Sequence, residues 1–348
     1  MKLLSFDIES CTGSHNDASL CSFGYVTADE FLNIKEQEDL LCNPKPAHFR
    51  LRPYSKKRQT EGITLAYSEK VFRRQPKFPG IYPKIKGLFD EADVAVGFSI
   101  ENDVQFLNNA CVEYGLPPVS YKFLDVRQIV ELLYGTKYGC GLKTIAENLE
   151  IAGNSHRSDE DARVTLEILR FVLKDQSMTL SEFVSAYGIK FGQVNAEGYS
   201  NMISERGLKA QLDEGHLTRR QKNGVFEEYV KRVCRNLVPV SDKMKGQRIS
   251  FSDKFVRDCP DEARSFVKAV YLSGGKFDLS GERANLYVRV SSYDDSEKIQ
   301  KLKTDYPKMK FCTYGEAKNE VEPFETEDFS SFDLKALVRV ASRPNRLK

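Results

Sequence analysis

Two acidic residues lie two positions apart near the start of the chain, in the run SFDIES at residues 5–10. Residues 2–8 are apolar enough to predict a buried strand, and side chains two apart on a strand share a face. Asp7 and Glu9 would then point the same way, about 7 Å apart. Two such carboxylates repel each other unless a cation lies between them, and oxygen ligands suit hard cations such as Mg²⁺. A solvated pair at a strand end is the plainer alternative.

Three further residues with suitable chemistry follow in the sequence. Asp103 falls in the first turn of a predicted helix after the short strand DVAVGF, at the sheet edge where α/β folds place ligands. Alternatively, its negative charge only stabilises the start of the helix by interacting with the helix dipole. Asp161 stands three residues after Ser158, the spacing of a capping box with Asp in place of Glu or Gln. His156, on the loop before that helix, is a candidate general base because histidine titrates near neutrality.

The elements that would position these residues form an α/β pattern. Strand-like runs at 2–8, 19–27 and 30–42 predict an antiparallel portion of a sheet. From residue 78 onward, helices and short strands alternate, ending in the periodic helix SDEDARVTLEILRFVLKD. Strands followed by alternating helices are typical of an α/β sandwich.

The segments FDIES, GFSIENDVQFL and HRSDEDARVTL resemble, in order, the three motifs of the DEDDh family of 3′–5′ exonucleases, over about residues 1–175. The stretches EGIT at 61–64 and FLDVRQIVELLYG are similar to other segments of that family. The resemblance implies a ribonuclease H-like mixed sheet flanked by helices, with two Mg²⁺ or Mn²⁺ ions. It implies the metal ligands Asp7, Glu9, Asp103 and Asp161, and His156 as the base that deprotonates water.

In this family, two metal ions about 4 Å apart bind the scissile phosphate, and nucleoside monophosphates leave from the 3′ end. The resemblance places Ile8, Thr12 and Gly13 near the terminal nucleotide. The chain departs from the family in two places. The first motif continues as SCTG, one residue longer than the usual TTG, and Asn102 stands where phenylalanine commonly precedes the second-motif acid.

The overall charge does not indicate a class of binding partner, because 52 basic residues nearly balance 50 acidic ones. Residues 43–77, however, hold ten basic and two acidic side chains and four prolines. This irregular segment would suit a single-stranded or frayed nucleic acid, since each neutralised phosphate releases counterions. Its aromatic residues, which are Phe49, Tyr54, Tyr67 and Phe72, would stack on unpaired bases. The alternative is that the segment is a solvated loop.

The remaining composition favours a soluble cytoplasmic protein. Eight cysteines without any CxxC pair are typical of reduced thiols, and the apolar run at the N-terminus is too short for a signal peptide or a membrane span. We therefore expect no membrane partner.

Residues 176–240 are polar and favour helix, either as a linker or as a small middle domain. Residues 241–330 resemble a BRCT domain in ISFSDKF and in the paired Gly274 and Gly275, although Asp253 replaces a motif glycine and the chain has no tryptophan. This part would bind a protein or nucleic-acid partner, with Ser252 and Lys298 as the residues of a phosphopeptide pocket. Residues 331–348 are predicted to be a basic tail.

These patterns together predict a metal-dependent 3′–5′ exonuclease that acts on DNA, in replication or repair. The preference for DNA over RNA rests only on the BRCT-like segment, so an exoribonuclease is an open alternative. A second alternative is a non-catalytic adaptor that acts through its C-terminal domain.

Overall fold

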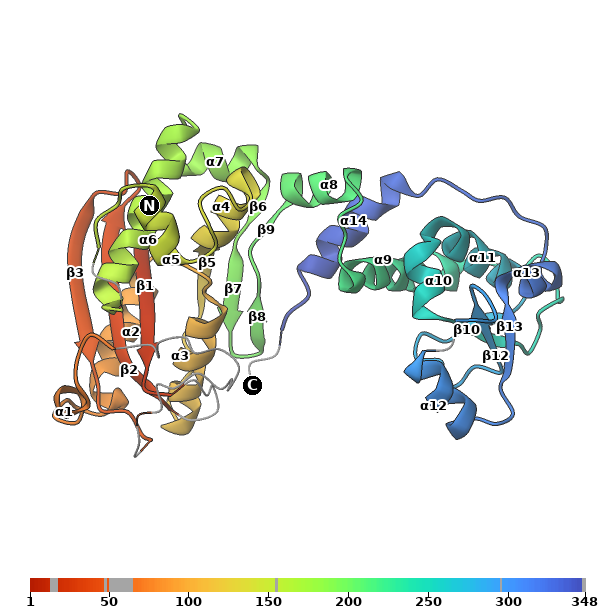
Figure 1. Ribbon diagram of the computed structural model, residues 1–348, viewed down its shortest axis with the longest axis horizontal. Coiled ribbons are helices and arrows are strands. Elements are labelled where there is room, and N and C mark those ends of the chain that lie inside the picture. The colour runs from red at the N-terminus through yellow and green to blue at the C-terminus, as the bar shows by residue number, and fades with distance from the viewer. Residues whose placement is uncertain (13–17, 47–48, 50–64, 154–155, 295, 346–348) are drawn as a thin grey trace. The chain divides into compact units, whose positions relative to one another are not determined.

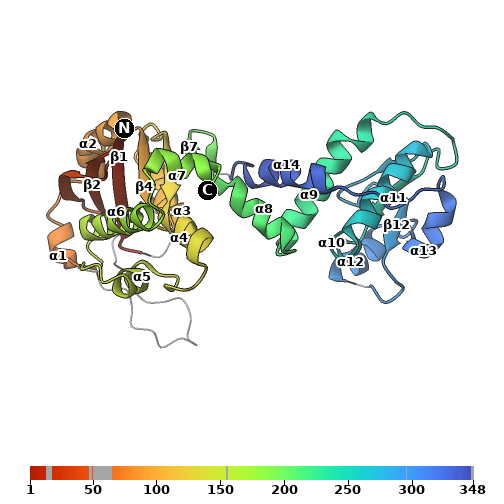
Figure 2. The ribbon, with the colours of Figure 1, turned by 90° about the horizontal axis from the view of Figure 1, so that it is seen from above.

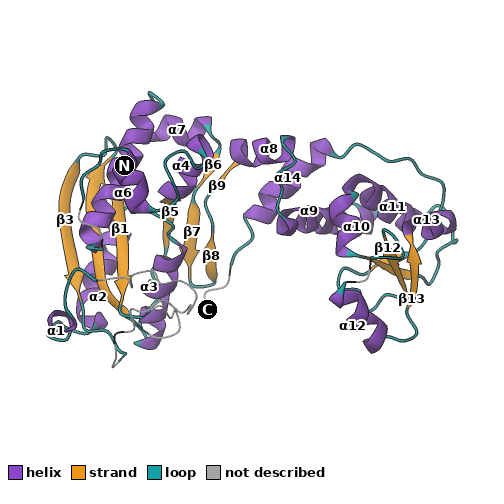
Figure 3. Ribbon diagram, in the orientation of Figure 1, coloured by secondary structure: helices purple, strands orange, loops and turns teal. Residues whose placement is uncertain are grey.

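The computed structural model describes residues 1–12, 18–46, 49, 65–153, 156–294 and 296–345. It contains two compact units, one made of residues 1–207 with 342–348 and the other of residues 208–341 (Figure 1). Each unit combines strands with helices (Figure 3). The predicted metal ligands and base all belong to the first unit.

The first unit is built on a seven-stranded mixed sheet in the order β3-β2-β1-β4-β5-β7-β8. β1 is antiparallel to β2, and β2 to β3, whereas β4 is parallel to both β1 and β5. β7 pairs antiparallel with β5 and β8, and a separate two-stranded sheet pairs β6 with β9. The strands are β1 (Lys2–Ser10), β2 (Leu20–Asp29), β3 (Ile34–Leu41), β4 (Val94–Gly97), β5 (Tyr121–Asp125), β6 (Ile189–Lys190), β7 (Gly192–Asn195), β8 (Gly198–Ser200) and β9 (Ile203–Ser204).

Helices cover both faces of this sheet. α6 lies in front of β1 and α2 behind it, and the view from above agrees (Figures 1 and 2). The helices of the unit are α1 (Glu69–Phe72), α2 (Phe78–Glu91), α3 (Glu101–Glu113), α4 (Val126–Tyr134), α5 (Leu142–Asn148), α6 (Ser158–Asp175) and α7 (Leu180–Ala186). The antiparallel start and the later alternation of helices and strands agree with the prediction. The predicted mixed sheet flanked by helices is confirmed for this unit.

The alternation of side chains along β1 separates the core from the polar site. Phe6 packs against Phe89 of α2, with ring centroids 5.1 Å apart, so even-numbered residues face α2. The hydroxyl of Ser5 donates a hydrogen bond of 2.7 Å to the carbonyl of Ala162, so odd-numbered residues face α6. Asp7 and Glu9 are therefore on the α6 side of the sheet.

The strand register places Asp7, Gly24 and Asp39 in one row across β1, β2 and β3. The first turn of α6 crosses this row at close range. A Cβ atom on Gly24 would lie 2.0 Å from the backbone nitrogen of Asp159 and 2.0 Å from the carbonyl carbon of Ser158. A glycine inside a strand often marks such an approach of another backbone.

We expect Gly24→Ala to lower the free energy of unfolding by roughly 1–3 kcal/mol or more, because the methyl group overlaps backbone atoms that have little room to move. Chemical denaturation of the full chain measures this change. Gly87→Ala on α2 is the matched control, since a Cβ there meets nothing within 4 Å and alanine favours a helix by up to about 1 kcal/mol. Equal stability of the two variants would contradict the close approach at Gly24.

The second unit contains a four-stranded, fully parallel sheet in the order β11-β10-β12-β13. Tyr287 on β12 packs in one apolar cluster with Ile299 of α12, while the adjacent Val288 belongs to a second cluster on the other face. The elements are α8 (Glu205–Asp213), which spans the boundary between the units, α9 (Arg219–Arg232), η1 (Cys234–Asn236), β10 (Arg248–Phe251), α10 (Asp253–Asp258), α11 (Pro260–Leu272), β11 (Lys276–Phe277), β12 (Leu286–Arg289), α12 (Glu297–Asp305), β13 (Lys310–Thr313), α13 (Tyr314–Ala317), η2 (Lys318–Glu320) and α14 (Ser330–Ala341).

The division into units differs from the boundaries drawn on the sequence. The unit boundary falls at residues 207 and 208, inside the segment 176–240 that was taken as a linker or middle domain. That segment holds the short strands β6 to β9, two of which extend the main sheet. The expected tail from residue 331 contains helix α14, whose buried Ala336, Leu337 and Val340 share one face.

Residues 247–315 of the second unit contain, in order, β10, α10, α11, the paired glycines, β11, β12, α12 and β13. The membership of this segment in the BRCT family stays a prediction. Within the described residues, no helix combines the length and the apolar character needed to cross a membrane.

Candidate active site

Three carboxylates from two elements meet at the end of β1. Asp7 and Glu9 come from β1, and Asp161 comes from the first turn of α6. Each offers one oxygen, and these three oxygens all lie within 4.8 Å of one another. The three acids were predicted from two separate sequence segments, and the structure brings them together.

Asp103, the fourth predicted acid, lies beside this cluster in the first turn of α3. Its Oδ1 accepts a hydrogen bond of 3.0 Å from the backbone N–H of Ile8. The pairing of β1 with β4 ends at Ser5. Beyond it, the backbone N–H of Ile8 has no strand partner on that side and donates to the carboxylate of Asp103. Asp103 is buried, with 7% of its surface exposed.

Asp125 fixes the turn from which α3 begins. Its carboxylate accepts hydrogen bonds of 3.1 Å and 3.4 Å from the backbone N–H groups of Ser99 and Ile100, directly before α3. It also caps α4 by accepting from the N–H of Arg127 at 3.0 Å. Ser99 has a left-handed φ of 57°, which an L-residue adopts only when its surroundings hold it there. Asp125 therefore helps to set the position of Asp103.

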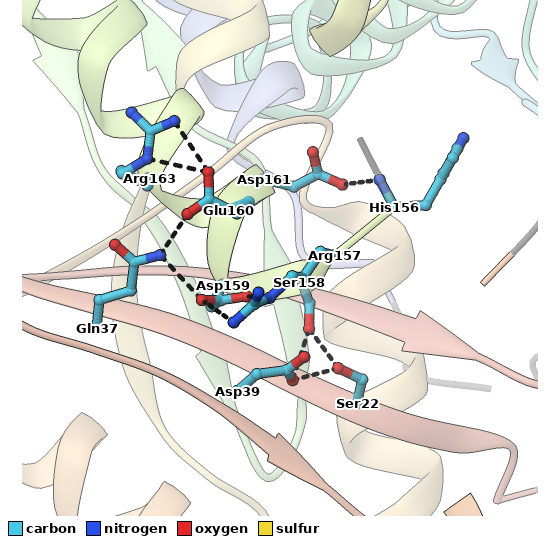
Figure 4. Close-up of polar contacts among 10 residues, drawn as sticks. All are labelled: Ser22, Gln37, Asp39, His156, Arg157, Ser158, Asp159, Glu160, Asp161 and Arg163. Atoms are coloured by element: carbon cyan, nitrogen blue, oxygen red, sulfur yellow. Dashed lines mark hydrogen bonds and ion pairs between the residues drawn. The ribbon is translucent and has the colours of Figure 1, made fainter. Parts of the chain in front are cut away.

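His156 lies at the solvent side of the cluster. Its backbone N–H donates a hydrogen bond of 3.0 Å to Oδ2 of Asp161 (Figure 4), and its φ of 68° is left-handed. Its Nδ1 is 3.9 Å from Oε1 of Glu9, and its side chain is 46% exposed against 16% for Glu9. The imidazole is thus close to the acids and open to a ligand from solvent.

Burial raises the pKa values of all four acids, and repulsion from neighbouring acids adds to the shift. Burial, followed by the charges of Asp103, Glu9 and Asp161, raises the pKa of Asp7 well above its usual value. Burial raises the pKa of Glu9 to about 8, with contributions from Asp161 and other acids. The pKa of Asp103 is also raised, mainly by burial, although backbone N–H groups oppose the shift. Burial raises the pKa of Asp161 to about 6, opposed by the N–H of His156.

A divalent cation would relieve this repulsion. The donor set consists of carboxylate oxygens alone, which hard cations such as Mg²⁺ and Mn²⁺ prefer over softer ions. The donors are partly buried and charged alike, an arrangement that costs stability unless a cation compensates it. The residues present therefore fit a site for a divalent cation.

This site gives a pH-dependent stability, and Glu9 contributes to it. In EDTA, the raised pKa of Glu9 means that its contribution to stability is fully present below its ordinary pKa of 4.5 and is lost as pH rises through about 8. Glu9→Gln does not titrate. We expect the variant to match the native protein near pH 4.5 and to exceed its stability above pH 8 by a few kcal/mol, since each tenfold change in proton affinity is about 1.4 kcal/mol.

Thermal unfolding of both proteins in EDTA across this pH range measures the difference. Saturating Mg²⁺ is the control, because a cation bound by the native site should favour the native protein. A difference that stays constant from pH 5 to pH 9 would show that Glu9 does not have a raised pKa.

The predicted capping box at the start of α6 is wrong. Arg157 is the N-cap, and its side chain makes no capping hydrogen bond. The hydroxyl of Ser158 bonds instead to Ser22 and Asp39, on neighbouring strands (Figure 4). Tertiary partners have replaced the local bond that the sequence pattern suggested.

The residues predicted to contact a nucleotide are only partly described. The side chain of Ile8 is buried, and its backbone N–H holds Asp103. Thr12 is 5% exposed, and its carbonyl accepts a hydrogen bond of 2.5 Å from the hydroxyl of Ser10. Gly13 lies outside the described residues, as does the EGIT segment at 61–64. The nucleotide-binding role of these residues stays a prediction.

The basic segment 43–77 is described only in part, since residues 47–48 and 50–64, including Tyr54, fall outside the description. Arg73 holds its ends together, donating to the carbonyls of Pro44 and Pro46 at 3.1 and 2.8 Å. Phe72 is 1% exposed, so its predicted stacking on bases is wrong. Phe72 is buried in a small apolar cluster, where Phe49 and Tyr67 pack against it.

In the second unit, the two residues considered for a phosphopeptide pocket have partners within the unit. The Ser252 hydroxyl accepts a hydrogen bond of 3.2 Å from the N–H of Phe255 and caps α10. Nζ of Lys298 lies 3.2 Å from Oδ1 of Asp253, whose Oδ2 also accepts from Arg219 at 2.6 Å. Asp253, which stands where the BRCT motif has glycine, therefore pairs with both Lys298 and Arg219. The phosphopeptide pocket stays a prediction.

The sequence did not single out Ser22, Gly24, Asp39 or Asp125. Ser22 and Gly24 are small residues on one face of a strand, a pattern that signals a closely packed neighbour. Asp39 belongs to an acid-rich strand, IKEQEDLL, which reads as a solvated edge. Only the register of the sheet shows that Asp39 faces α6.

Comparison with known families gives one match. Residues 4–169, just under half of the chain, match the RNase_T family model, which is described as exonuclease. The matched span contains the four acids and the histidine of the cluster. No curated protein matches the sequence. The family match supports a nuclease.

Several solved structures of exonuclease I resemble the chain at low sequence identity. One exonuclease I structure, described as suggesting how processivity is achieved, is 13% identical to this chain. The matched region covers 54% of this chain and 43% of the exonuclease I chain, with a TM-score of 0.43. The E. coli enzyme with zinc and single-stranded DNA is 14% identical, covering 53% and 43%, with a TM-score of 0.44. The enzyme of Methylocaldum szegediense is 16% identical, covering 53% and 43%, with a TM-score of 0.42. The chain thus spans less than half the length of these structures.

Proposed function

We propose that the first unit is a metal-dependent 3′–5′ exonuclease that releases nucleoside monophosphates from a single-stranded or frayed DNA end. The observation that carries the proposal is the cluster of Asp7, Glu9 and Asp161, whose oxygens lie within 4.8 Å of one another. Asp103 and His156 adjoin it, and the span that matches the exonuclease family contains all five residues.

In the proposed mechanism, Asp7, Glu9, Asp103 and Asp161 hold two Mg²⁺ or Mn²⁺ ions. When bound, such ions supply positive charge that activates water and steadies a leaving oxygen. His156 removes the proton from the attacking water at Nε2, the ring nitrogen that does not face Glu9. A new bond forms between the water oxygen and phosphorus, and the bond from phosphorus to the 3′-oxygen of the penultimate nucleotide breaks. That oxygen takes a proton from solvent.

The test uses the purified full chain with single-stranded DNA and RNA oligonucleotides of one sequence, labelled at the 5′ end. Reactions contain Mg²⁺ or Mn²⁺, with EDTA as the control. A 3′–5′ exonuclease shortens the labelled strand stepwise, and a 3′-phosphorothioate linkage slows the first step. Release of a labelled mononucleotide at the outset would indicate the opposite polarity.

The alternatives give different results in the same assay. Stepwise shortening of RNA but not DNA would identify an exoribonuclease, because the pocket would then depend on the 2′-hydroxyl. Absence of cation-dependent release from either polymer would favour an adaptor acting through the second unit. Glu91→Gln is a matched control variant, since this exposed residue ends α2 and pairs with Lys2, which begins β1, whereas Asp7 and Glu9 lie near the other end of that strand.

A further inference from the structure

Three polar side chains from three elements meet under the first turn of α6. Ser22 lies on β2, Asp39 on β3 and Ser158 at the start of the helix. The hydroxyl of Ser22 donates to Oδ1 of Asp39, and the hydroxyl of Ser158 donates to the same oxygen at 3.0 Å. The two hydroxyl oxygens also lie within hydrogen-bonding distance of each other. We call these three residues the serine–aspartate tie (Figure 4).

The tie is well enclosed. Ser22 is 2% exposed, and Ser158 is fully buried. Gly24, the neighbour of Ser22 on the same face of β2, leaves the space into which the backbone of Ser158 and Asp159 fits. Asp39 is only half-buried, but the hydrogen bonds that the two buried hydroxyls donate resist breaking, because a separated hydroxyl would be left buried and unsatisfied.

The turn held by the tie carries the residues that complete the acid cluster. Asp161 lies three residues after Ser158, less than one helical turn away. A displacement of this turn would move Asp161, and with it the His156 backbone that bonds to its carboxylate. Asp7 and Glu9 would stay in place, because they belong to the central strand β1.

We propose that Ser22, Asp39 and Ser158 are positioning residues for the cation site, which set Asp161 against Asp7 and Glu9. This inference rests on the proposed function. The three residues touch no reacting group; they act through the helix turn that carries Asp161. Partners that orient a ligand in this way often matter nearly as much as the ligand itself.

One other role for Asp39 needs to be separated from positioning. Its negative charge helps to raise the pKa of both Asp7 and Glu9, so it also contributes to the field that attracts a cation. Asp39→Asn removes the charge but keeps an oxygen that accepts from both serines, whereas Asp39→Ala removes both. A positioning role predicts that only the alanine variant loses function.

The experiment measures Mn²⁺ binding by calorimetry on the full chain, without nucleic acid. We expect Ser22→Ala with Ser158→Ala, and also Asp39→Ala, to bind Mn²⁺ roughly 10- to 100-fold more weakly. Asp39→Asn should remain close to the native protein. Ser204→Ala is the matched control, because its hydroxyl makes two hydrogen bonds, to Tyr187 and Gly207, away from the site.

Thermal unfolding in EDTA shows whether each variant is folded. If the double serine variant does not fold, the paired comparison at Asp39 decides the question alone. Native affinity in the folded serine variant, or equal losses in both Asp39 variants, would overturn the positioning role while leaving the proposed function intact. Absence of Mn²⁺ binding by the unaltered protein would overturn the proposed cation site and this inference with it.

Discussion

Asp7→Asn is expected to lower the release of mononucleotides by about a thousandfold or more. The change keeps the shape of the side chain but removes a charge at the centre of the acid cluster. Losing a cation from the site costs several kcal/mol of transition-state stabilisation, and about 4 kcal/mol corresponds to a thousandfold in rate. The labelled-DNA assay in Mg²⁺ measures the effect.

The same substitution should make the cation-free protein more stable. Asp7 is buried among like charges that raise its pKa, so its ionised form destabilises the fold at neutral pH. We expect a higher melting temperature than the native protein in EDTA and a smaller rise on adding Mg²⁺. Loss of turnover with lowered stability would mean that the variant has simply lost its fold. Undiminished turnover would show that Asp7 is not a ligand.

Local patterns predicted where each acid lies on its own element, and the resemblance to the DEDDh motifs joined the four acids into one predicted set. The alternation of residues along β1 puts Asp7 and Glu9 on one face. Asp103 and Asp161 occupy the first turns of strongly patterned helices, whose starts meet the ends of neighbouring strands. Periodicity thus predicted the helix or strand that carries each acid, whereas the grouping of the acids at one site rested on the resemblance.

Ser158 shows where such reasoning fails. Its spacing to Asp161 is that of a capping box, and local bonds are what a sequence pattern reveals. In the fold, a partner 119 residues away competes for the same hydroxyl. Asp39 can bond to this hydroxyl because Gly24 allows the helix backbone to approach the sheet. Gly24 and Asp39 lie far from Ser158 in the sequence, so the residues around Ser158 do not reveal the contact.

The strands β6 to β9 were missed for a related reason. They contain only two to four residues each, too few for alternation to stand out from a polar background. β7 is ordered because β5 offers it an unpaired edge, so its conformation depends on a distant strand. A short strand is therefore predicted better from the sheet it joins than from its own residues.

His156→Asn should lower turnover by roughly 10²- to 10⁴-fold, the usual contribution of a general base. It should scarcely change the affinity for Mn²⁺, because the imidazole is half-exposed and its Nδ1 is 3.9 Å from the nearest acid oxygen. Turnover with labelled DNA and Mn²⁺ calorimetry test the two halves of this prediction.

Asparagine is the better replacement because the backbone at His156 has a left-handed φ of 68°. Asparagine tolerates that conformation and alanine does not, so His156→Ala adds strain to the loss of the ring. If the imidazole is the base, both variants should lose turnover alike, and added imidazole should restore part of it. If instead the backbone N–H that bonds Asp161 is what matters, asparagine should keep activity and only alanine should fail. Weak Mn²⁺ binding by the asparagine variant would show that His156 is a ligand, because the backbone is then preserved and only the ring has changed.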